Sequence, residues 1–176
     1  MDDAQLIQKI MNGDKMAANE LIERYYDMIY RYICHMGCSI ETAKDITQDV
    51  FITMMQSLPT YKEQGYFRAW LYRIAHNQTM NTLKKSSNEK RRMQREKMED
   101  VAPDFSEQRV NRELLKNLLS QLPVKQRDAI VLKYYHGFTA KEIANITNST
   151  LPGVKSRLFQ ALRKLKARIK EEEIIE

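Results

Sequence analysis

The fold is decided by residues 122–165, LPVKQRDAIVLKYYHGFTAKEIANITNSTLPGVKSRLFQALRKL. Their pattern predicts a helix that ends near His136, a short helix from about Thr139 to Ile146, a tight polar turn and a long basic helix. This order of parts is typical of a helix-turn-helix, in which the last helix enters the major groove of DNA. The sequence thus predicts a DNA-binding element in this part of the chain.

Both of the later helices carry start signals. Thr139 is a candidate N-cap for the short helix, and Glu142, three residues later, completes a capping box. Thr150 is a candidate N-cap for the long helix, with Pro152 in its first turn. These signals place the start of each helix and the turn between them.

The long basic helix has two contrasting faces. One is an apolar stripe wide enough to require a covering helix, and Ile143, Ala144 and Ile146 of the short helix supply that cover. The other is polar and contains Phe159, which packing alone does not explain; the alternative is a solvated basic face on an ordinary helical domain. The apolar stripe comprises Val154, Leu158, Ala161, Leu162 and Leu165. The polar face comprises Ser156, Phe159, Gln160 and Arg163, flanked by Lys155, Arg157 and Lys164.

Charge is distributed along the chain in blocks. Residues 1–60 carry a net charge of −4, residues 61–95 carry +7 and residues 122–170 carry +9. Two basic blocks separated by a more acidic stretch predict two contacts with a polyanion. The acidic first block fits either a basic protein partner or an ordinary solvated surface, and charge alone does not separate these.

Composition favours an all-α protein, because the chain has only five Gly and four Pro and is rich in Leu, Ile, Met, Lys and Glu. Its 176 residues suffice for one or two small domains. No apolar run approaches the ~20 residues needed to cross a membrane, and the acidic start MDDAQ does not resemble a signal peptide. We therefore expect a cytoplasmic protein without membrane insertion of its own.

Cys34 and Cys38, with His35 between them, raise the question of a metal or redox site. Zinc sites usually take four ligands from two separated pairs, and the sequence has no second Cys pair. Residues four apart share a helix face, so we interpret both as reduced structural thiols and expect no metal and no cofactor. No nucleotide-binding loop and no nucleophile–base pair points to an enzyme.

Four helices are predicted in the first half of the chain, because apolar residues recur there at three- and four-residue spacing. Gly13, Gly37 and Pro59 interrupt this pattern and separate the helices. The stretch that follows is dense in charge and almost free of aliphatic residues, so it cannot bury enough surface to fold alone. We predict two small helical domains joined by this charged linker. The predicted boundaries are residues 1–86 for the first domain, 87–107 for the linker and 108–176 for the second domain.

The helix predicted from Phe67 to about Lys85 has an apolar stripe that includes Trp70, which we assign to the core. Tyr61 and Tyr66 stand at the two ends of the loop before it. Aromatic rings beside cations form the surface expected for unstacked bases, because rings stack on bases and cations hold phosphates. The alternative is that the two tyrosines only cover the core. The polar side chains along this helix are Arg68, Arg73, His76, Asn77, Asn81 and Lys84.

Together the two halves resemble bacterial sigma factors of the extracytoplasmic-function (ECF) group, which carry only regions 2 and 4 of their family. Residues 45–51, DITQDVF, are similar to the region 2.2 signature, and residues 67–77, FRAWLYRIAHN, to that of regions 2.3–2.4. These motifs occur in the family's order and spacing and span nearly the whole chain outside the linker. The region 4 matches are Leu122-Pro123 with Arg127, Glu142-Ile143-Ala144, and Val154-Lys155-Ser156-Arg157-Leu158.

The resemblance implies two partners, core RNA polymerase and promoter DNA. Asp45, Gln48 and Asp49 match the positions that dock on the coiled coil of the largest polymerase subunit, in agreement with the acidic balance of this half. Residues 60–66 match the loop that holds a base flipped out of the minus-ten element. Asn81 stands beside that element, where many members have Asp. The predicted minus-ten contacts are Tyr61, Tyr66, Arg73, His76, Asn77 and Asn81.

For the minus-thirty-five element, the resemblance implies base reading by the polar face of the long basic helix. Gln160 can bond an adenine edge, and Phe159 can pack on a thymine methyl group. Cations nearer the backbone add affinity without sequence choice. The predicted base readers are Lys155, Ser156, Phe159 and Gln160, and the predicted phosphate contacts are Arg157 and Arg163.

The turn before this helix departs from the family pattern. Members have a sequence similar to Leu-Gly-Ile-Ser-x-Gly-Thr, where this chain has TNSTLPG at residues 147–153. Asn148 tolerates the left-handed conformation that Gly would adopt. Ser149 lacks the buried apolar anchor, which we expect Leu151 to restore in part. We expect the fold to survive with a somewhat looser turn.

The resemblance implies a dissociable polymerase subunit that selects promoters, helps to melt them and catalyses nothing, under the control of an anti-sigma factor. The rival hypothesis is a helix-turn-helix repressor whose N-terminal domain senses a ligand or metal through Cys34, His35 and Cys38. Such repressors usually dimerise to match two half-sites, and the sequence contains no clear dimer seam.

Overall fold

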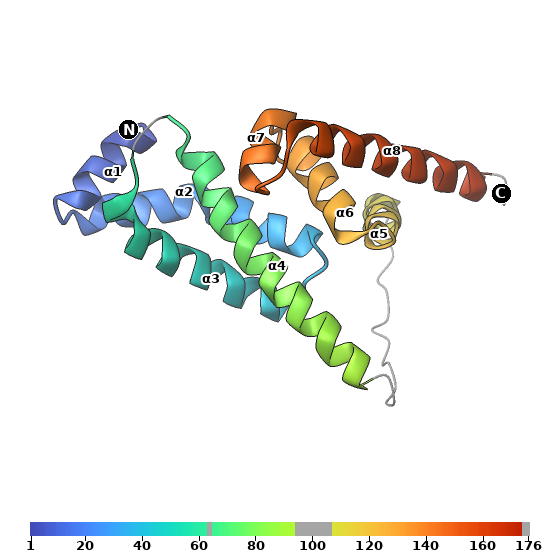
Figure 1. Cartoon of the computed structure of the whole chain (residues 1–176). Helices are drawn as coiled ribbons and strands as arrows, with labels where there is room; N and C mark the ends of the chain where they lie inside the picture. Colours follow the sequence, from blue (N-terminus) through green and yellow to red (C-terminus); the bar gives the residue numbers. More distant parts are fainter. Residues whose placement is uncertain (63–64, 94–106, 174–176) are drawn as a thin grey trace.

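In the computed structural model, the chain is built from α-helices with short connections (Figure 1). The structure describes residues 1–62, 65–93 and 107–173, without the side chains of 88–93, 107–113 and 171–173, and this described part contains no β-strand. The predicted all-α class is therefore confirmed. The helices are α1 (Asp3–Met11), α2 (Lys15–His35), α3 (Ile40–Ser57), α4 (Phe67–Met93), α5 (Glu107–Ser120), α6 (Val124–Ile130), α7 (Ala140–Ile146) and α8 (Leu151–Glu173). Two short segments complete them, the 3₁₀ turn η1 (Leu58–Thr60) and the π-helical segment η2 (Val131–Tyr135).

Helices α1 to α4 pack around one apolar core. Leu21, Ile29, Met54 and Leu71 from three of these helices are all fully buried. Each such side chain stabilises the fold by about 1.5–3 kcal/mol relative to an exposed position. The breaks lie where the sequence predicts them: α1 and α2 are separated at residues 12–14, where the Asp14 carboxylate caps α2 by accepting from the backbone N–H groups of two residues in its first turn.

Helices α6, α7 and α8 form the predicted helix-turn-helix. Thr139 and Glu142 make the predicted capping box at the start of α7. The Thr150 hydroxyl accepts from the backbone N–H of Gly153, as expected for the cap of α8. The apolar stripe of α8 packs on α6 and α7, and its Val154 is fully buried. The order of parts predicted from the sequence is confirmed.

Two helix ends differ from the sequence-based expectation. The helix predicted to end near Lys85 continues to Met93 as α4, so the first residues of the predicted linker are helical; residues 94–106 lie outside the described part. The helix predicted to run to His136 changes from α to π geometry over its last turn. In that turn the backbone N–H of His136 donates to the carbonyl of Val131 at 3.2 Å.

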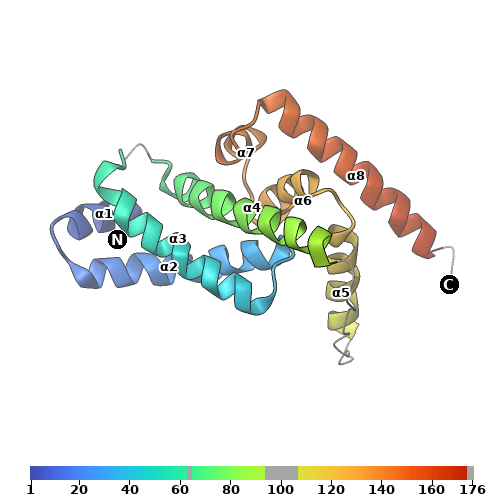
Figure 2. The ribbon, with the colours of Figure 1, turned by 60° about the horizontal axis from the view of Figure 1, so that its bottom comes forward.

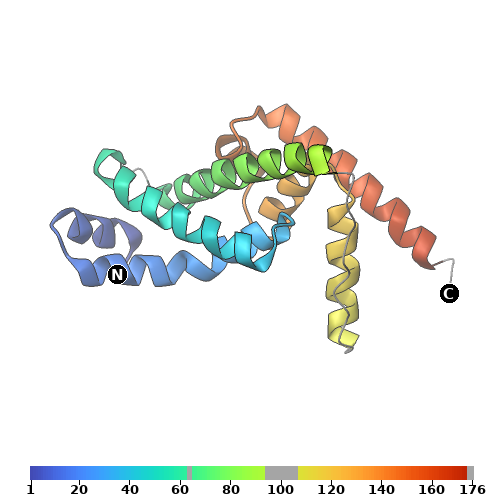
Figure 3. The ribbon, with the colours of Figure 1, turned by 90° about the horizontal axis from the view of Figure 1, so that it is seen from below.

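Helix α4 lies at the boundary between the first half of the molecule, α1–α4, and the second half, α5–α8. On one side it packs against α2 and α3, and on the other it faces α6 and α7 (Figure 2). Seen from below, α5 and the far end of α8 extend away from the α1–α4 group (Figure 3). The predicted minus-ten residues thus lie on or just before α4, against which α7 of the helix-turn-helix packs. None of the described helices combines the length and the apolar character required to span a bilayer.

Candidate nucleic-acid interface

The start of α4 borders an aromatic cavity of about 400 Å³. The Tyr61 and Trp70 rings are packed with their centroids 4.6 Å apart, whereas the Tyr66 side chain is 64% exposed. Trp70, assigned to the core from the sequence, is only half-buried and forms part of the cavity wall. The cavity is lined by Thr60, Tyr61, Lys62, Tyr66, Ala69, Trp70, Arg73, Asn145 and Ile146.

Aromatic faces and cations coexist in this aromatic cavity. Lys62 and Arg73 are both exposed at its edge and can hold phosphate groups, while the rings offer flat apolar surface for a base. The two tyrosines, for which base stacking and covering of the core were the alternatives, lie in different surroundings. Tyr61 covers Phe67 and Trp70, as a core-covering residue would, and Tyr66 presents its ring to solvent.

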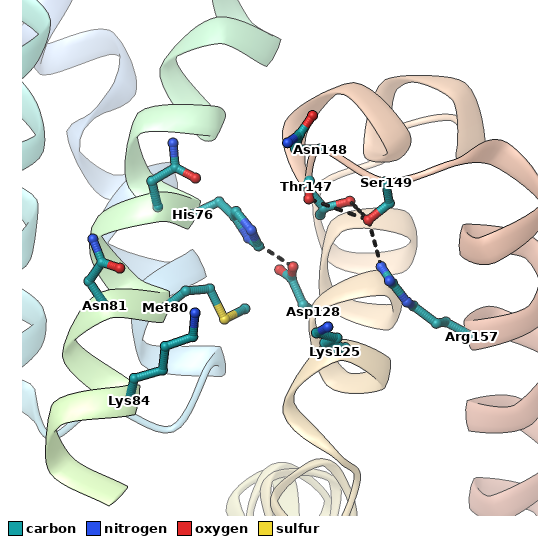
Figure 4. A pocket seen from close by; sticks show the side chains of 11 residues that line it. His76, Met80, Asn81, Lys84, Lys125, Asp128, Thr147, Asn148, Ser149 and Arg157 are labelled. Atoms are coloured by element: carbon teal, nitrogen blue, oxygen red, sulfur yellow. Dashed lines mark hydrogen bonds and ion pairs between the residues drawn. The ribbon is translucent and has the colours of Figure 1, made fainter. Parts of the chain in front are cut away.

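Further along α4, the predicted minus-ten residues line a second, polar cleft of about 480 Å³ (Figure 4). Asn77 and Asn81 are exposed on its α4 side. His76 points across the cleft to α6, where its Nδ1 lies 2.9 Å from a carboxylate oxygen of Asp128. The opposite wall is formed by the turn before α8, residues 147–149, and by Arg157.

Helix α3 presents the predicted polymerase contacts. Asp45, Gln48 and Asp49 are exposed along one side, while Ile46 and Val50 on the other side are buried in the α1–α4 core. Their exposure agrees with the expectation that they lie on a free helix face. The chemistry of this face is acidic, as a basic protein partner would require.

Most of the predicted minus-thirty-five residues lie on the outer face of α8. Lys155, Ser156, Gln160 and Arg163 are exposed, and the Phe159 side chain is 67% exposed. This exposure of a large apolar ring is what the two-face pattern of the sequence predicted.

Arg157 is placed differently from the other predicted contacts on α8. It is half-buried, and its Nη1 donates to the Ser149 hydroxyl at 2.8 Å, while the Thr147 hydroxyl donates to the same oxygen at 2.9 Å. The expectation that Leu151 replaces the missing apolar anchor is wrong, because Leu151 is 37% exposed. A polar anchor at Ser149 takes that place. Asn148 adopts the expected left-handed conformation with φ 49°.

Comparison with known proteins agrees with this arrangement. Residues 21–89 match the family model of Sigma-70 region 2, and residues 112–165 match that of Sigma-70 region 4. Together the two matches cover well over half of the chain. The chain belongs to the sigma-70 family. It is a sigma factor of the ECF type, with regions 2 and 4, as the sequence motifs indicated.

Individual relatives of this sigma factor match over nearly their full length. The ECF RNA polymerase sigma factor SigW of Bacillus subtilis is 28% identical, with 94% of this chain and 95% of that protein covered. The RNA polymerase sigma-H factor of Pseudomonas aeruginosa is 27% identical, with 90% and 89% covered. Among solved structures, CnrH in complex with the cytosolic domain of CnrY matches with a TM-score of 0.74 at 21% identity, covering 96% of this chain and 97% of that chain.

The two halves of this sigma factor meet in a contact that the sequence motifs did not indicate, here called the junction. Its residues are Tyr32, Arg68, Tyr72 and His76 in the first half, and Asp128, His136 and Phe138 in the second. The Tyr32 hydroxyl donates to Asp128 at 2.8 Å, and the Tyr72 hydroxyl hydrogen-bonds His136 Nδ1 at 2.7 Å. Arg68 donates to the His136 carbonyl and places its guanidinium 4.3 Å from the centre of the Phe138 ring.

Burial in the junction shifts the titration of its side chains. It raises the pKa of Tyr72 to about 12. Burial, together with the neighbouring charges of His35 and Arg68, lowers the pKa of His136 to about 4. Arg68, which the sequence shows only as a polar side chain along α4, and His76, a predicted minus-ten contact, both bind the second half of this sigma factor in the structure.

Arg127, part of the region 4 motif, joins the halves a second time. Its Nε donates to the Leu119 carbonyl at 2.9 Å and its Nη1 to the Met36 carbonyl at 2.8 Å. At the adjoining Gly37, with φ +93°, an added Cβ would lie 2.8 Å from Arg127 Nη1, so the guanidinium would have to shift. Arg127 thus ties α6 to the end of α2.

The two cysteines of this sigma factor are free thiols and half-buried. Burial raises the pKa of Cys38 to about 11, so its thiol is protonated at neutral pH. The His35 ring packs on Tyr135 with the ring centroids 4.2 Å apart. Within the residues that the structure describes, no three His, Cys, Asp or Glu side chains are grouped closely enough to hold a metal ion.

Proposed function

We propose that this sigma factor binds core RNA polymerase, directs it to a set of promoters and helps to melt them. The observation that carries this proposal is the pair of nucleic-acid surfaces: the aromatic cavity at the start of α4 and the exposed polar face of α8 around Phe159. The aromatic residues of the cavity lie in the region 2 match, with Asn145 and Ile146 of the region 4 match closing one side, and the face of α8 lies in the region 4 match. The protein acts on promoters in the cytoplasm.

Promoter melting follows from differential binding. The face of α8 binds duplex base edges and phosphates and is indifferent to whether the downstream base pairs are open. Tyr66 and its neighbours in the aromatic cavity bind only a base that has left the stack, at roughly 1–3 kcal/mol per stacked base. This difference lowers the free energy of the open complex relative to the closed one. No bond is made or broken by the sigma factor, so we propose that it has no catalytic activity of its own.

The acidic face of α3 is the proposed polymerase contact. Asp45, Gln48 and Asp49 are exposed in a half of the chain with a net negative charge. Such a surface pairs with basic side chains and speeds association through long-range attraction.

We also propose control by an anti-sigma factor. A solved sigma factor with a TM-score of 0.74 to this chain, RpoE of Bartonella quintana, was determined in complex with the anti-sigma factor NepR, at 21% identity and with 86% of this chain and 96% of that chain covered. In this chain the faces of α3 and α8 are exposed, so an inhibitor that covers both would block the proposed polymerase contact and the proposed upstream DNA contact.

The proposal is tested by reconstitution. Core polymerase with the full chain is expected to start transcription at a defined site in a promoter library, whereas core polymerase alone is not. A protein that binds the selected DNA without polymerase and reduces transcription would instead be the rival repressor.

A further inference from the structure

A hydrogen-bonded relay connects α6 to the reading face of α8. The Gln126 side chain is 9% exposed, and its Nε2 donates to Gln160 Oε1 at 2.9 Å. Gln160 Nε2 in turn donates to the Ser156 hydroxyl at 3.2 Å. Both Gln160 and Ser156 belong to the proposed minus-thirty-five readers, whereas Gln126 does not.

The relay fixes which hydrogen-bonding groups Gln160 offers to DNA. A free glutamine side chain samples several rotamers and turns its amide freely. Here one lone pair of Oε1 and one N–H of Nε2 are engaged within the protein. One acceptor position and one donor position remain, and they are held in a fixed order. An adenine edge in the major groove offers one donor, N6–H, and one acceptor, N7, which is the matching pair.

Gln126 itself is too buried to act on DNA directly. It lies in the first turn of α6, a helix that packs against α8. Its effect on readout therefore passes through the side chain it binds.

We propose that Gln126 is a positioning residue for promoter choice: its hydrogen bond orients Gln160 and so sets the preferred base at one position of the upstream element. This inference rests on the proposed function, because it requires α8 to read that element. It assigns a role in specificity to a residue outside the DNA-facing surface of α8.

The test uses holoenzyme reconstituted from core polymerase and the full chain. A promoter library randomised in its upstream element is transcribed, and the templates of the transcripts are sequenced. The variants are Gln126→Met, Gln160→Ala and the double variant. Methionine keeps the volume of glutamine without its amide, so the packing of α6 on α8 is retained. Melting temperatures of all variants are measured alongside.

Gln126→Met is expected to relax preference at one base pair by roughly tenfold, within the range for loss of a bidentate contact. Gln160→Ala should relax the same base pair, and the double variant should equal Gln160→Ala, because Gln126 has no other route to the DNA. Exposed Lys116 on α5 supplies an inert control: Lys116→Met should leave the preference unchanged. Arg163→Ala removes a predicted phosphate contact. It should therefore weaken binding to all promoter sequences alike and reduce the slope of log affinity against log salt concentration by about one.

A second variant covers the case in which Gln126→Met does not fold. In Gln126→Glu, assayed at a pH at which the new carboxyl is ionised, the carboxylate can only accept, so Gln160 must turn its Nε2 toward it. The order of donor and acceptor facing the DNA then reverses, and the preferred base is expected to change at the same position.

Three results overturn the inference while leaving the proposed function intact. The first is full wild-type preference in a folded Gln126→Met holoenzyme. The second is a further loss of preference in the double variant beyond Gln160→Ala. The third is wild-type preference in Gln126→Glu. The proposed function fails in a different way: wild-type holoenzyme would then start transcription at no defined site and show no base preference at any position.

Discussion

His136 illustrates how one buried side chain links this fold to pH. Its pKa of about 4 lies below the ordinary value of 6.5, so the folded chain binds this proton less readily than the unfolded chain. The stability that depends on a neutral His136 is therefore fully present above pH 6.5 and is lost as the pH falls toward 4. The full effect is about 3 kcal/mol.

We expect His136→Gln to remove this dependence, because glutamine can still hydrogen-bond Tyr72 but does not titrate. Urea unfolding at pH 7 and pH 5 measures it. The wild type should lose about 2 kcal/mol more than the variant between the two. Equal losses in both proteins would show that His136 is not the group responsible.

The junction also shows what residue patterns cannot reveal. Tyr32 and Asp128 are 96 positions apart, and neither belongs to a periodic motif that links the two halves. Periodicity identifies the buried face of each helix but not which residue of another domain will meet it. The exposed residues, including Asp49 and Phe159, were predictable because they break or oppose the apolar stripe of their own helix.

At the scale of the element, α3 carries a prediction for the polymerase contact. Asp49→Lys should weaken binding to core polymerase, because it reverses a charge on an exposed acidic face. Stability should change by about 0.5 kcal/mol or less, since the side chain is exposed. Titration of labelled chain with core polymerase, together with thermal melting, measures both. The matched control is Asp27→Lys on α2, which is also an exposed carboxylate and lies outside the family's docking motif. Undiminished binding by Asp49→Lys would remove α3 from the proposed contact.

The aromatic cavity at the start of α4 gives a second prediction at the scale of the element. Tyr66→Ala should leave binding to duplex promoter DNA unchanged and reduce open-complex formation by roughly 5- to 100-fold, the loss of one base-stacking contact. Permanganate footprinting of melted thymines measures it. Tyr134, also an exposed tyrosine at 58%, lies outside the cavity, and Tyr134→Ala is the control. A melted region as extensive as in wild type would exclude Tyr66 from base capture.

Helix limits were predictable where a capping residue or a glycine fixes them. Thr139, Glu142 and Thr150 cap as the sequence indicates. The end of α4 was not predictable, because the charged residues after Lys85 lack an apolar stripe but also lack a strong stop signal. The π geometry of η2 was not predictable either. A π-helix has about one more residue per turn than an α-helix, and the apolar pattern of a five-residue segment is too short to distinguish the two.

At the scale of the whole molecule, the junction joins the two halves through buried hydrogen bonds, and we expect them to unfold together. Asp128 is 2% exposed and contacts both Tyr32 and His76. We expect Asp128→Ala to destabilise the protein by about 1–3 kcal/mol, because the Tyr32 hydroxyl is left buried without its acceptor. Differential scanning calorimetry should show one transition in wild type and a broadened or divided one in the variant.

The control for this prediction is another carboxylate in an ion pair. Asp27 pairs with Arg31 on the surface of α2, and both side chains are more than 60% exposed. Asp27→Ala should cost less than about 1 kcal/mol. If Asp128→Ala cost no more than Asp27→Ala, the junction would not contribute to stability in solution.

Gly37 and its neighbour Arg127 have a consequence for mutational tolerance. At Gly37 a side chain would be strained by a φ of +93° and would collide with a guanidinium that is itself held by carbonyl oxygens from both halves. Gly13, with a similar φ of +88°, has open space around it. In a saturation library selected for promoter activity, position 13 should accept asparagine, which tolerates this conformation, whereas position 37 should accept only glycine. Two glycines that the sequence presents as equivalent helix breakers would thus differ sharply in the variation they permit.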